Sequence, residues 1–422
     1  MSADRLKADL VESGTMGRVS PIRVERRGDL DPKNGLTRPA GTQENKKIRD
    51  YAVRRMKEAG LEVQIDEIGN IFGRKKGSKT NKGTVMVGSH LDSVINGGMF
   101  DGALGVFGAL EAVGRINDEG FENERPVEVV AFTGEEGSAF HVSLLGSLVL
   151  IGNLELDKAL GMKNDEGITL KDALEAIGHR GNFHRSLDNV EYMVELHIEQ
   201  GPVLDKEKIS IGILENITGM TWVTATIEGE ENHAGTTPMR MRADALVAAA
   251  DIIRFVHKRV NEMVSEFDGS AVATVGKLNV FPNGINIVPG RVEMGIDIRD
   301  VVEKNMRNLT QEIIETFKSI EDKYYGVRTN VEISFIHSPT PLSEEVARII
   351  EESTEKAGVT AKRMNSGAGH DAQNMAKKVK TGMIFVPSVD GISHAPTEWT
   401  NWNDIENGVK VLTQTLKKLS KT

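Results

Sequence analysis

The chain has 422 residues, a formal net charge of −10 at pH 7 and no cysteine. This length exceeds the usual size of one domain, so we expect two domains with an ample hydrophobic core. The negative charge leaves no basic stripe for nucleic acid, and no Lys/Arg-rich amphipathic segment indicates a membrane surface, so a small-molecule substrate is expected. The absence of cysteine excludes disulfides and thiolate ligands, so any metal site must use histidines and carboxylates.

The N-terminal segment of residues 1–7 lacks the apolar core of a signal peptide, and nowhere do eighteen apolar residues follow one another. We therefore expect a cytoplasmic protein without a membrane partner.

The first informative element in chain order is a short apolar strand over residues 84–87, which leads into GSHLDSVINGGMFDG at 88–102. Residues two apart in an extended chain share a face, so His90 and Asp92 are expected to point the same way. His90 can then bind a metal through one ring nitrogen while Asp92 holds the other. Asp101 returns to the same point from the glycine-rich loop. The alternative is a strand that ends in ordinary polar turn residues.

Three further apolar strands also end in polar groups. The strand 127–132 is followed by Glu135 and Glu136, the strand 192–196 delivers His197, and the strand 383–387 precedes His394. Parallel sheets place their chemistry at the carboxyl ends of their strands, so these side chains are expected to meet at one edge. Adjacent glutamates elsewhere are usually a solvated surface pair.

Together the strand ends offer two acids and three histidines as metal ligands: His90, Asp101, Glu136, His197 and His394. We expect them to hold two divalent ions with Asp101 shared between the two, and Glu135 to remain free as a general base. Nitrogen and oxygen ligands without sulfur suit zinc, manganese, cobalt or nickel, so the identity of the metal stays open. A site of this kind predicts hydrolysis of an amide-like bond.

The pattern of elements changes after residue 215. Strand, helix, two strands, helix and strand follow one another, which predicts a ferredoxin-like α+β domain over 216–330, inserted between the two parts, 1–215 and 331–422, of an α/β domain. The expected elements of the insert are a strand at 222–228, a helix at 243–257, strands at 271–278 and 291–299, a helix at 303–320 and a strand at 330–335.

Arg299 ends a strand whose even-numbered positions, 292 to 298, are all apolar. Arg299 therefore lies on the opposite face, where its guanidinium can meet a ligand carboxylate with two parallel hydrogen bonds. The alternative is a solvated strand arginine.

The chain resembles, over essentially its whole length, the hydantoinase/carbamoylase branch of the M20 di-metal amidohydrolases. This branch includes N-carbamoyl-L-amino acid hydrolases, allantoate amidohydrolases and β-ureidopropionases. The resemblance is carried by GSHLDSVINGGMFDG, TGEEGSAF, ELHIEQGPVLD, NHAGTTPM, SGAGHDAQ and SHAP. His197 stands where peptidases and deacylases of the wider family carry an acid, which favours the carbamoylase branch over a plain peptidase.

The resemblance implies a di-zinc-peptidase-like catalytic domain with a central, mostly parallel sheet flanked by helices, and an inserted domain that serves as lid and dimerisation domain. It implies a homodimer in which His233 reaches the partner's active site and stabilises the oxyanion, although a histidine in such a loop is otherwise an ordinary turn residue. Asn286 and Arg299 match the family's contacts to the substrate carboxylate. Gln200, Gly369 and His370 match its substrate pocket, although the loop 367–371 also suits simple helix capping.

The predicted activity is hydrolysis of a linear ureido group, with Glu135 moving the proton and with Asp92 and His233 as the other catalytic residues. An N-carbamoyl-L-amino acid would give the amino acid, carbon dioxide and ammonia, while allantoate and β-ureidopropionate are alternatives. Ala139 stands where family members commonly have arginine, and Leu148 replaces a polar residue, which disfavours allantoate. An aminoacylase or peptidase is a further alternative, and the intact Glu135 argues against a non-catalytic metal-binding protein.

Overall fold

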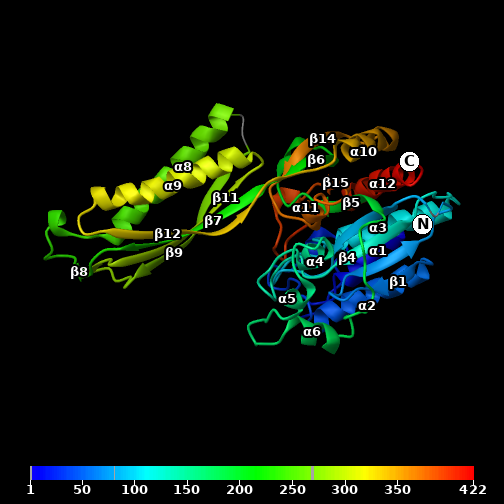
Figure 1. The fold of residues 1–422 in the computed structure, drawn as a ribbon, viewed down its shortest axis with the longest axis horizontal. Coiled ribbons are helices and arrows are strands. Elements are labelled where there is room, and N and C mark those ends of the chain that lie inside the picture. The colour runs from blue at the N-terminus through cyan, green and yellow to red at the C-terminus, as the bar shows by residue number, and fades with distance from the viewer. Residues whose placement is uncertain (1, 80, 268–269) are drawn as a thin grey trace. The chain divides into compact units, whose positions relative to one another are not determined.

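The computed structural model describes residues 2–79, 81–267 and 270–422 and divides into two compact units, 1–215 with 341–422, and 216–340 (Figure 1). The predicted second boundary, at 330/331, is wrong by ten residues. It falls inside strand β12 (Arg328–His337), which pairs along its length with β7 (Gly219–Glu228) of the second unit. Because cutting a strand out of its sheet would leave β7 unpaired on that side, the boundary lies at Thr340.

The first unit is built on one mixed sheet in the order β1-β2-β4-β3-β5-β15-β6-β13, with β14 beside β6. The strands β4, β3, β5 and β15 are parallel to one another, while β2 and β6 run antiparallel to their neighbours β4 and β15. The bounds are β1 (Glu62–Ile65), β2 (Ile71–Lys75), β3 (Thr84–His90), β4 (Val127–Phe132), β5 (Val190–Ile198), β6 (Ile211–Ile217), β13 (Thr340–Pro341), β14 (Ala361–Ser366) and β15 (Lys380–Val386).

Helices cover both faces of this sheet, which explains why its parallel strands β3 and β4 are buried along their whole length. In β3, Val85 and Val87 belong to the core on one face and Met86 to the core on the other. The first core includes side chains of α1 (Ser2–Ser13), α2 (Gln43–Glu58), α3 (Ala103–Asp118), α10 (Glu344–Ala357) and α12 (Trp402–Leu419). The opposite side carries α4 (Leu145–Leu150), α5 (Leu156–Leu160), α6 (Leu170–Ala176) and α11 (Asp371–Met375). The short helix α7 (Val203–Glu207) follows β5.

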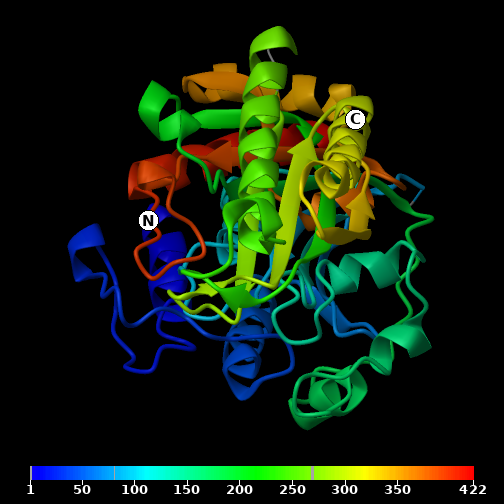
Figure 2. The same cartoon turned by 90° about the vertical axis from the view of Figure 1, so that its left-hand side faces the viewer.

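The second unit is an antiparallel sheet in the order β12-β7-β11-β9, with two helices on one face. Its elements follow one another as β7, α8 (Ala245–Phe267), β9 (Val272–Phe281), β11 (Arg291–Asp300), α9 (Glu303–Lys323) and β12, which is the ferredoxin-like order. Figures 1 and 2 show α8 and α9 side by side over the sheet. A small ribbon of β8 (Asn232–His233) and β10 (Ile287–Val288) completes the unit.

Helix α8 continues ten residues beyond the predicted end at His257. Val260 and Met263 extend its apolar stripe and are buried in the core of the second unit, so packing prolongs the helix. Within the described part of the chain, none of the helices combines the length and apolar character needed to cross a membrane.

Candidate metal centre and active site

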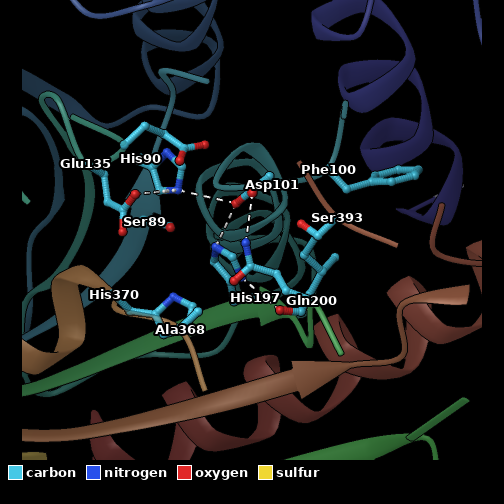
Figure 3. Close-up of polar contacts among 12 residues, drawn as sticks. Ser89, His90, Phe100, Asp101, Glu135, His197, Gln200, Ala368, His370 and Ser393 are labelled. Carbon is cyan, nitrogen blue, oxygen red and sulfur yellow. Dashed lines mark hydrogen bonds and ion pairs between the residues drawn. The ribbon is translucent and has the colours of Figure 1, made fainter. Parts of the chain in front are cut away.

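The predicted ligands lie at the carboxyl ends of four neighbouring parallel strands. His90 is the last residue of β3, His197 is the penultimate residue of β5, Glu136 follows β4, and His394 follows β15. Asp101 stands just before the first turn of α3, at the centre of the group shown in Figure 3. The parallel register of the sheet therefore gathers side chains that are up to 304 positions apart in the sequence, from His90 to His394.

Asp101 divides its two carboxylate oxygens between two groups of ligands. Its Oδ1 lies 3.2 Å from His197 Nε2 and 3.5 Å from His90 Nε2. Its Oδ2 lies 3.1 Å from His394 Nε2, which is also 3.5 Å from Glu136 Oε2. Both triads, His90 with Asp101 and His197, and Asp101 with Glu136 and His394, are compact enough to hold a metal ion. Asp101 thus belongs to both triads.

The backbone fixes how two of the histidines face the centre. His90 Nδ1 lies 3.2 Å from the carbonyl oxygen of Asp92, and His197 Nδ1 lies 2.9 Å from that of Ile198. Each Nδ1 therefore carries the proton and leaves Nε2 as an acceptor or metal ligand. His197 Nε2 is buried and faces Asp101 Oδ1 at 3.2 Å. A buried acceptor of this kind is satisfied by a cation, so these residues fit a metal site.

Gly102 permits the close approach of α3 to His90. Its φ is +64°, and a Cβ at this position would lie 2.4 Å from the imidazole of His90. Any side chain at residue 102 would displace the ring from Asp101. The glycine after Asp101 is therefore required by the packing of the site.

The buried carboxyl groups of the site favour binding of a cation. Burial raises the pKa of Glu135 well above its usual value, and burial together with repulsion from Asp101 raises the pKa of Glu136 to about 8. Although burial opposes the change, the three surrounding histidine rings stabilise the charged form of Asp101 and hold its pKa well below its usual value. The contact with Asp101 also raises the pKa of His394 to about 9. Carboxylates crowded in this way are stabilised by a bound divalent ion.

Asp92 does not play the part that the strand alternation predicts. Its carboxylate lies 3.8 Å from His90 Nδ1, and its backbone carbonyl makes the contact instead. The two carboxylate oxygens accept hydrogen bonds from the backbone amides of Glu135 and Glu136, at 3.2 and 3.1 Å. Asp92 therefore holds the turn that carries both glutamates.

Glu135 stands beside the ligands, outside the two triads that share Asp101, and forms a third compact group with His90 and Glu136. Its Oε2 is 3.7 Å from His90 Nε2, and only 8% of the residue is exposed (Figure 3). This position suits a base that handles a proton next to a metal site.

Gln200 and His370 surround the centre in different ways. Gln200 Nε2 donates to Asp101 Oδ2 at 2.9 Å and lies 3.3 Å from His394 Nε2. Both Gln200 and His394 have positive φ, 60° and 54°, a strained backbone that is typical of functional sites. The ring of His370 is buried, 4.6 Å from that of His197, and its Nε2 pairs with Ser366 Oγ at 2.9 Å. His370 thus packs edge-on against the ring of His197.

Two buried glutamates of the site were missed in the sequence. Glu195 accepts hydrogen bonds from Ser89 Oγ at 2.6 Å and from the backbone amide of Ala372 at 2.9 Å. Glu398 accepts from the backbone amides of Phe100 and Asp101, at 3.1 and 3.2 Å. The signal for Glu195 was a charged residue in the middle of an apolar strand, because such a residue requires buried partners.

The remaining predicted residues lie in the second unit, at opposite ends of β11. His233 and Asn286 are adjacent, since the amide of Ala234 donates to the carbonyl oxygen of Asn286 at 3.0 Å. Arg299 lies at the far end of β11, eight residues beyond Arg291, or about 26 Å along the strand. The fold does not bring Arg299 together with the other two in one chain.

The loop after β8 fixes the tautomer of His233. Its Nδ1 accepts hydrogen bonds from the amides of Gly235 and Thr236, at 3.0 and 3.2 Å. A neutral imidazole that accepts at Nδ1 carries its proton on Nε2. His233 is exposed, so its ring offers an N–H donor to an external acceptor.

A family model described as peptidase family M20/M25/M40 matches residues 86–418. The chain belongs to this family. Among its relatives, the N-carbamoyl-L-amino acid amidohydrolase of Geobacillus stearothermophilus is 38% identical over 100% of this chain and 99% of the relative. The allantoate amidohydrolase of Escherichia coli K12 is 36% identical over 92% and 94%. A crystal structure of a hydantoinase/carbamoylase family amidase from Burkholderia multivorans is similar with a TM-score of 0.92 and 35% identity, covering 100% of this chain and 98% of the other. This M20 chain is thus similar in sequence and fold to enzymes of the predicted branch.

Proposed function

We propose that this chain is a metal-dependent amidohydrolase that cleaves a C–N bond of an N-carbamoyl-L-amino acid and yields the amino acid, carbon dioxide and ammonia. The observation that carries the proposal is the pair of ligand triads that share Asp101, with Glu135 beside them and outside both. Full-length similarity to an N-carbamoyl-L-amino acid amidohydrolase supports the choice of substrate.

The two triads would hold one divalent ion each. His90, Asp101 and His197 would bind the first, and Asp101, Glu136 and His394 the second. When bound, such ions supply Lewis-acid chemistry, because they polarise the amide carbonyl and make a water molecule more acidic. The set of nitrogen and oxygen ligands suits zinc, manganese, cobalt or nickel.

Glu135 would carry the proton through the reaction. It takes a proton from the attacking water and returns it to the departing nitrogen, so the net change is the addition of water across the C–N bond. Burial raises the pKa of Glu135 and so favours its protonated form after the first transfer. Asp92 assists by fixing the backbone of the turn through the amides of Glu135 and Glu136.

The second unit would supply the groups that bind the substrate carboxylate and the oxyanion. Arg299 would bind the carboxylate, and His233 would donate its Nε2–H to the oxyanion. Asn286 lies beside His233, about 26 Å along β11 from the Arg299 end, so one chain cannot bring Asn286 and Arg299 to one small substrate. This separation supports a homodimer in which His233 and Asn286 serve the partner's site and the second unit acts as lid and dimerisation domain.

Allantoate is a second candidate substrate, because a relative of similar identity is an allantoate amidohydrolase. Ala139 argues against it, since this side chain packs against an apolar cluster with Phe140 and Leu145 and offers no charge to a polar ureide. β-Ureidopropionate and N-acyl amino acids remain the other candidates, and His197 in place of an acid disfavours the N-acyl class.

The test is release of ammonia and free amine from a panel of substrates. The panel contains N-carbamoyl-L-amino acids, allantoate, β-ureidopropionate and N-acetyl amino acids, and the chelated protein is reloaded separately with manganese, zinc, cobalt or nickel. We expect metal-dependent turnover of the carbamoyl compounds. Turnover of N-acetyl or peptide substrates alone would overturn the proposal in favour of a deacylase.

A further inference from the structure

Arg299 is held by a carboxylate on its own strand. Asp297 and Arg299 are two residues apart on β11 and therefore share a face of the sheet. Arg299 Nε donates to Asp297 Oδ1 at 2.9 Å, and Nη2 donates to Oδ2 at 3.0 Å. The pair is bidentate.

A tryptophan on the neighbouring strand holds Asp297 in turn. Trp222 of β7 is the register partner of Asp297, and its Nε1 donates to Asp297 Oδ2 at 2.8 Å. The indole packs against the ring of Phe335 on β12, with 5.3 Å between ring centroids. The neighbouring strands β12, β7 and β11 of this sheet (Figure 1) thus carry the side chains of the chain of contacts that ends at Arg299.

We propose that Asp297 is a positioning residue that holds the Arg299 guanidinium ready for the carboxylate of the substrate. The inference rests on the proposed function for the role of Arg299 and adds Asp297, with Trp222 behind it, as the determinant of its geometry. A free arginine side chain must lose rotamer freedom when it binds a ligand, whereas one already fixed on a rigid strand has lost it beforehand. Asp297 therefore strengthens binding of substrates that bear a carboxylate, although it carries the same charge as that group.

The same strand offers a matched control. Arg291 and Glu293 repeat the spacing on the same face of β11, and Arg291 Nη2 donates to Glu293 Oε1 at 2.7 Å. The acids are equally exposed, 29% for the side chain of Glu293 and 28% for that of Asp297. Removing the charge of Glu293 breaks an ion pair with the same spacing on the same face, through one hydrogen bond and not two, and leaves Arg299 untouched.

The experiment compares Asp297→Asn with Glu293→Gln in the full-length, metal-loaded protein. The substrate is the best carboxylate-bearing compound of the panel, tested beside its carboxamide analogue. For Asp297→Asn we expect a rise in KM of about tenfold, equivalent to about 1.4 kcal/mol, with kcat within about threefold of wild type. Glu293→Gln should keep both constants. With the carboxamide, Asp297→Asn and wild type should have equal KM, because that analogue has no carboxylate for Arg299 to bind.

Asp297→Glu restores the charge and should recover part of the lost affinity, which a variant that merely disturbs the strand would not do. If Asp297→Asn fails to fold, Asp297→Glu and Trp222→Phe replace it, and both should raise KM for the carboxylate substrate alone. An unchanged KM in Asp297→Asn, or an equal rise with the carboxamide, overturns the inference. Failure of the proposed function is a different result, since wild type would then cleave no carbamoyl substrate. The KM of Asp297→Asn for an N-acetyl amino acid, which also bears a carboxylate, would still test the role of Asp297.

Discussion

Replacing Asp92 by asparagine tests whether this carboxylate holds the turn of the two glutamates. Its oxygens accept from the backbone amides of Glu135 and Glu136, at 3.2 and 3.1 Å, and the residue is 2% exposed. Asparagine keeps one acceptor and turns an NH2 group toward the other amide. One of the two backbone N–H groups therefore loses its partner in a buried place.

The magnitude follows from these two contacts. A buried donor left without a partner costs about 1–3 kcal/mol, and the turn would move to avoid this cost. Glu136 is a predicted metal ligand and Glu135 is the predicted base. A shift of the turn would therefore displace both the ligand and the base. Loss of a residue that orients metal ligands typically weakens metal affinity by about 10–100-fold, and we expect Asp92→Asn to fall in this range with a similar loss of kcat.

The assay is competition with a chelator to measure metal affinity, together with kcat for the best substrate. Asp66→Asn is the control, because Asp66 is also buried; its Oδ1 accepts from the backbone amides of Ile68 and Asn70 at 3.2 and 2.7 Å, and its Oδ2 accepts from Asn70 Nδ2 at 2.9 Å. The control should lose stability but keep metal affinity. If Asp92→Asn binds metal and turns over within about twofold of wild type, a range far below the 10–100-fold expected of a lost orienting group, the turn does not depend on Asp92 and the reasoning is refuted.

Three further predictions concern a base, a dimer and a buried histidine. Glu135→Gln should keep its metal content and lose turnover by at least about 100-fold, as expected of a general base; near-normal turnover would exclude Glu135 as the base. Mixing inactive His233→Ala with inactive Glu135→Gln should restore partial activity if His233 serves the partner's site, and no recovery after demonstrated subunit exchange would contradict this. Burial and the neighbouring Arg49 lower the pKa of His179 to about 4, while the unfolded chain binds this proton near pH 6.5. Acid therefore favours unfolding, and the free energy of unfolding should fall between pH 6.5 and 4 by about 1–2 kcal/mol more in wild type than in His179→Gln, after a discount for solvent screening. Equal pH dependence of the two proteins would contradict the shift.

The gathering of the ligands was predictable because two signals in the sequence agree. The central strands are continuous apolar runs, which predicts that both faces are buried and that the strands are parallel. His90 and His197 come at the end of such a run, and His394 follows another after a short loop. The carboxyl ends of neighbouring parallel strands lie at the same edge of the sheet. Residues at these ends are therefore close in space even when they are far apart in the sequence.

The contacts of Asp92 were not predictable, because strand alternation gives the face of a side chain and not its partner. The choice between the imidazole of His90 and two backbone amides depends on how the turn of Glu135 and Glu136 folds, and that turn comes from another strand. The boundary at residue 331 failed for a related reason. Strand β12 pairs with β7, about a hundred residues earlier, and no local pattern at 331 records this long-range pairing.

The most direct test of the central claim is a titration of the chelated protein with one metal ion, with ammonia release from an N-carbamoyl-L-amino acid as the readout and bound metal counted per chain. The account predicts that the metal-free protein is inactive and that activity reaches its maximum when two ions are bound per chain. Full activity with one ion, or activity that persists without metal, would contradict the shared role of Asp101.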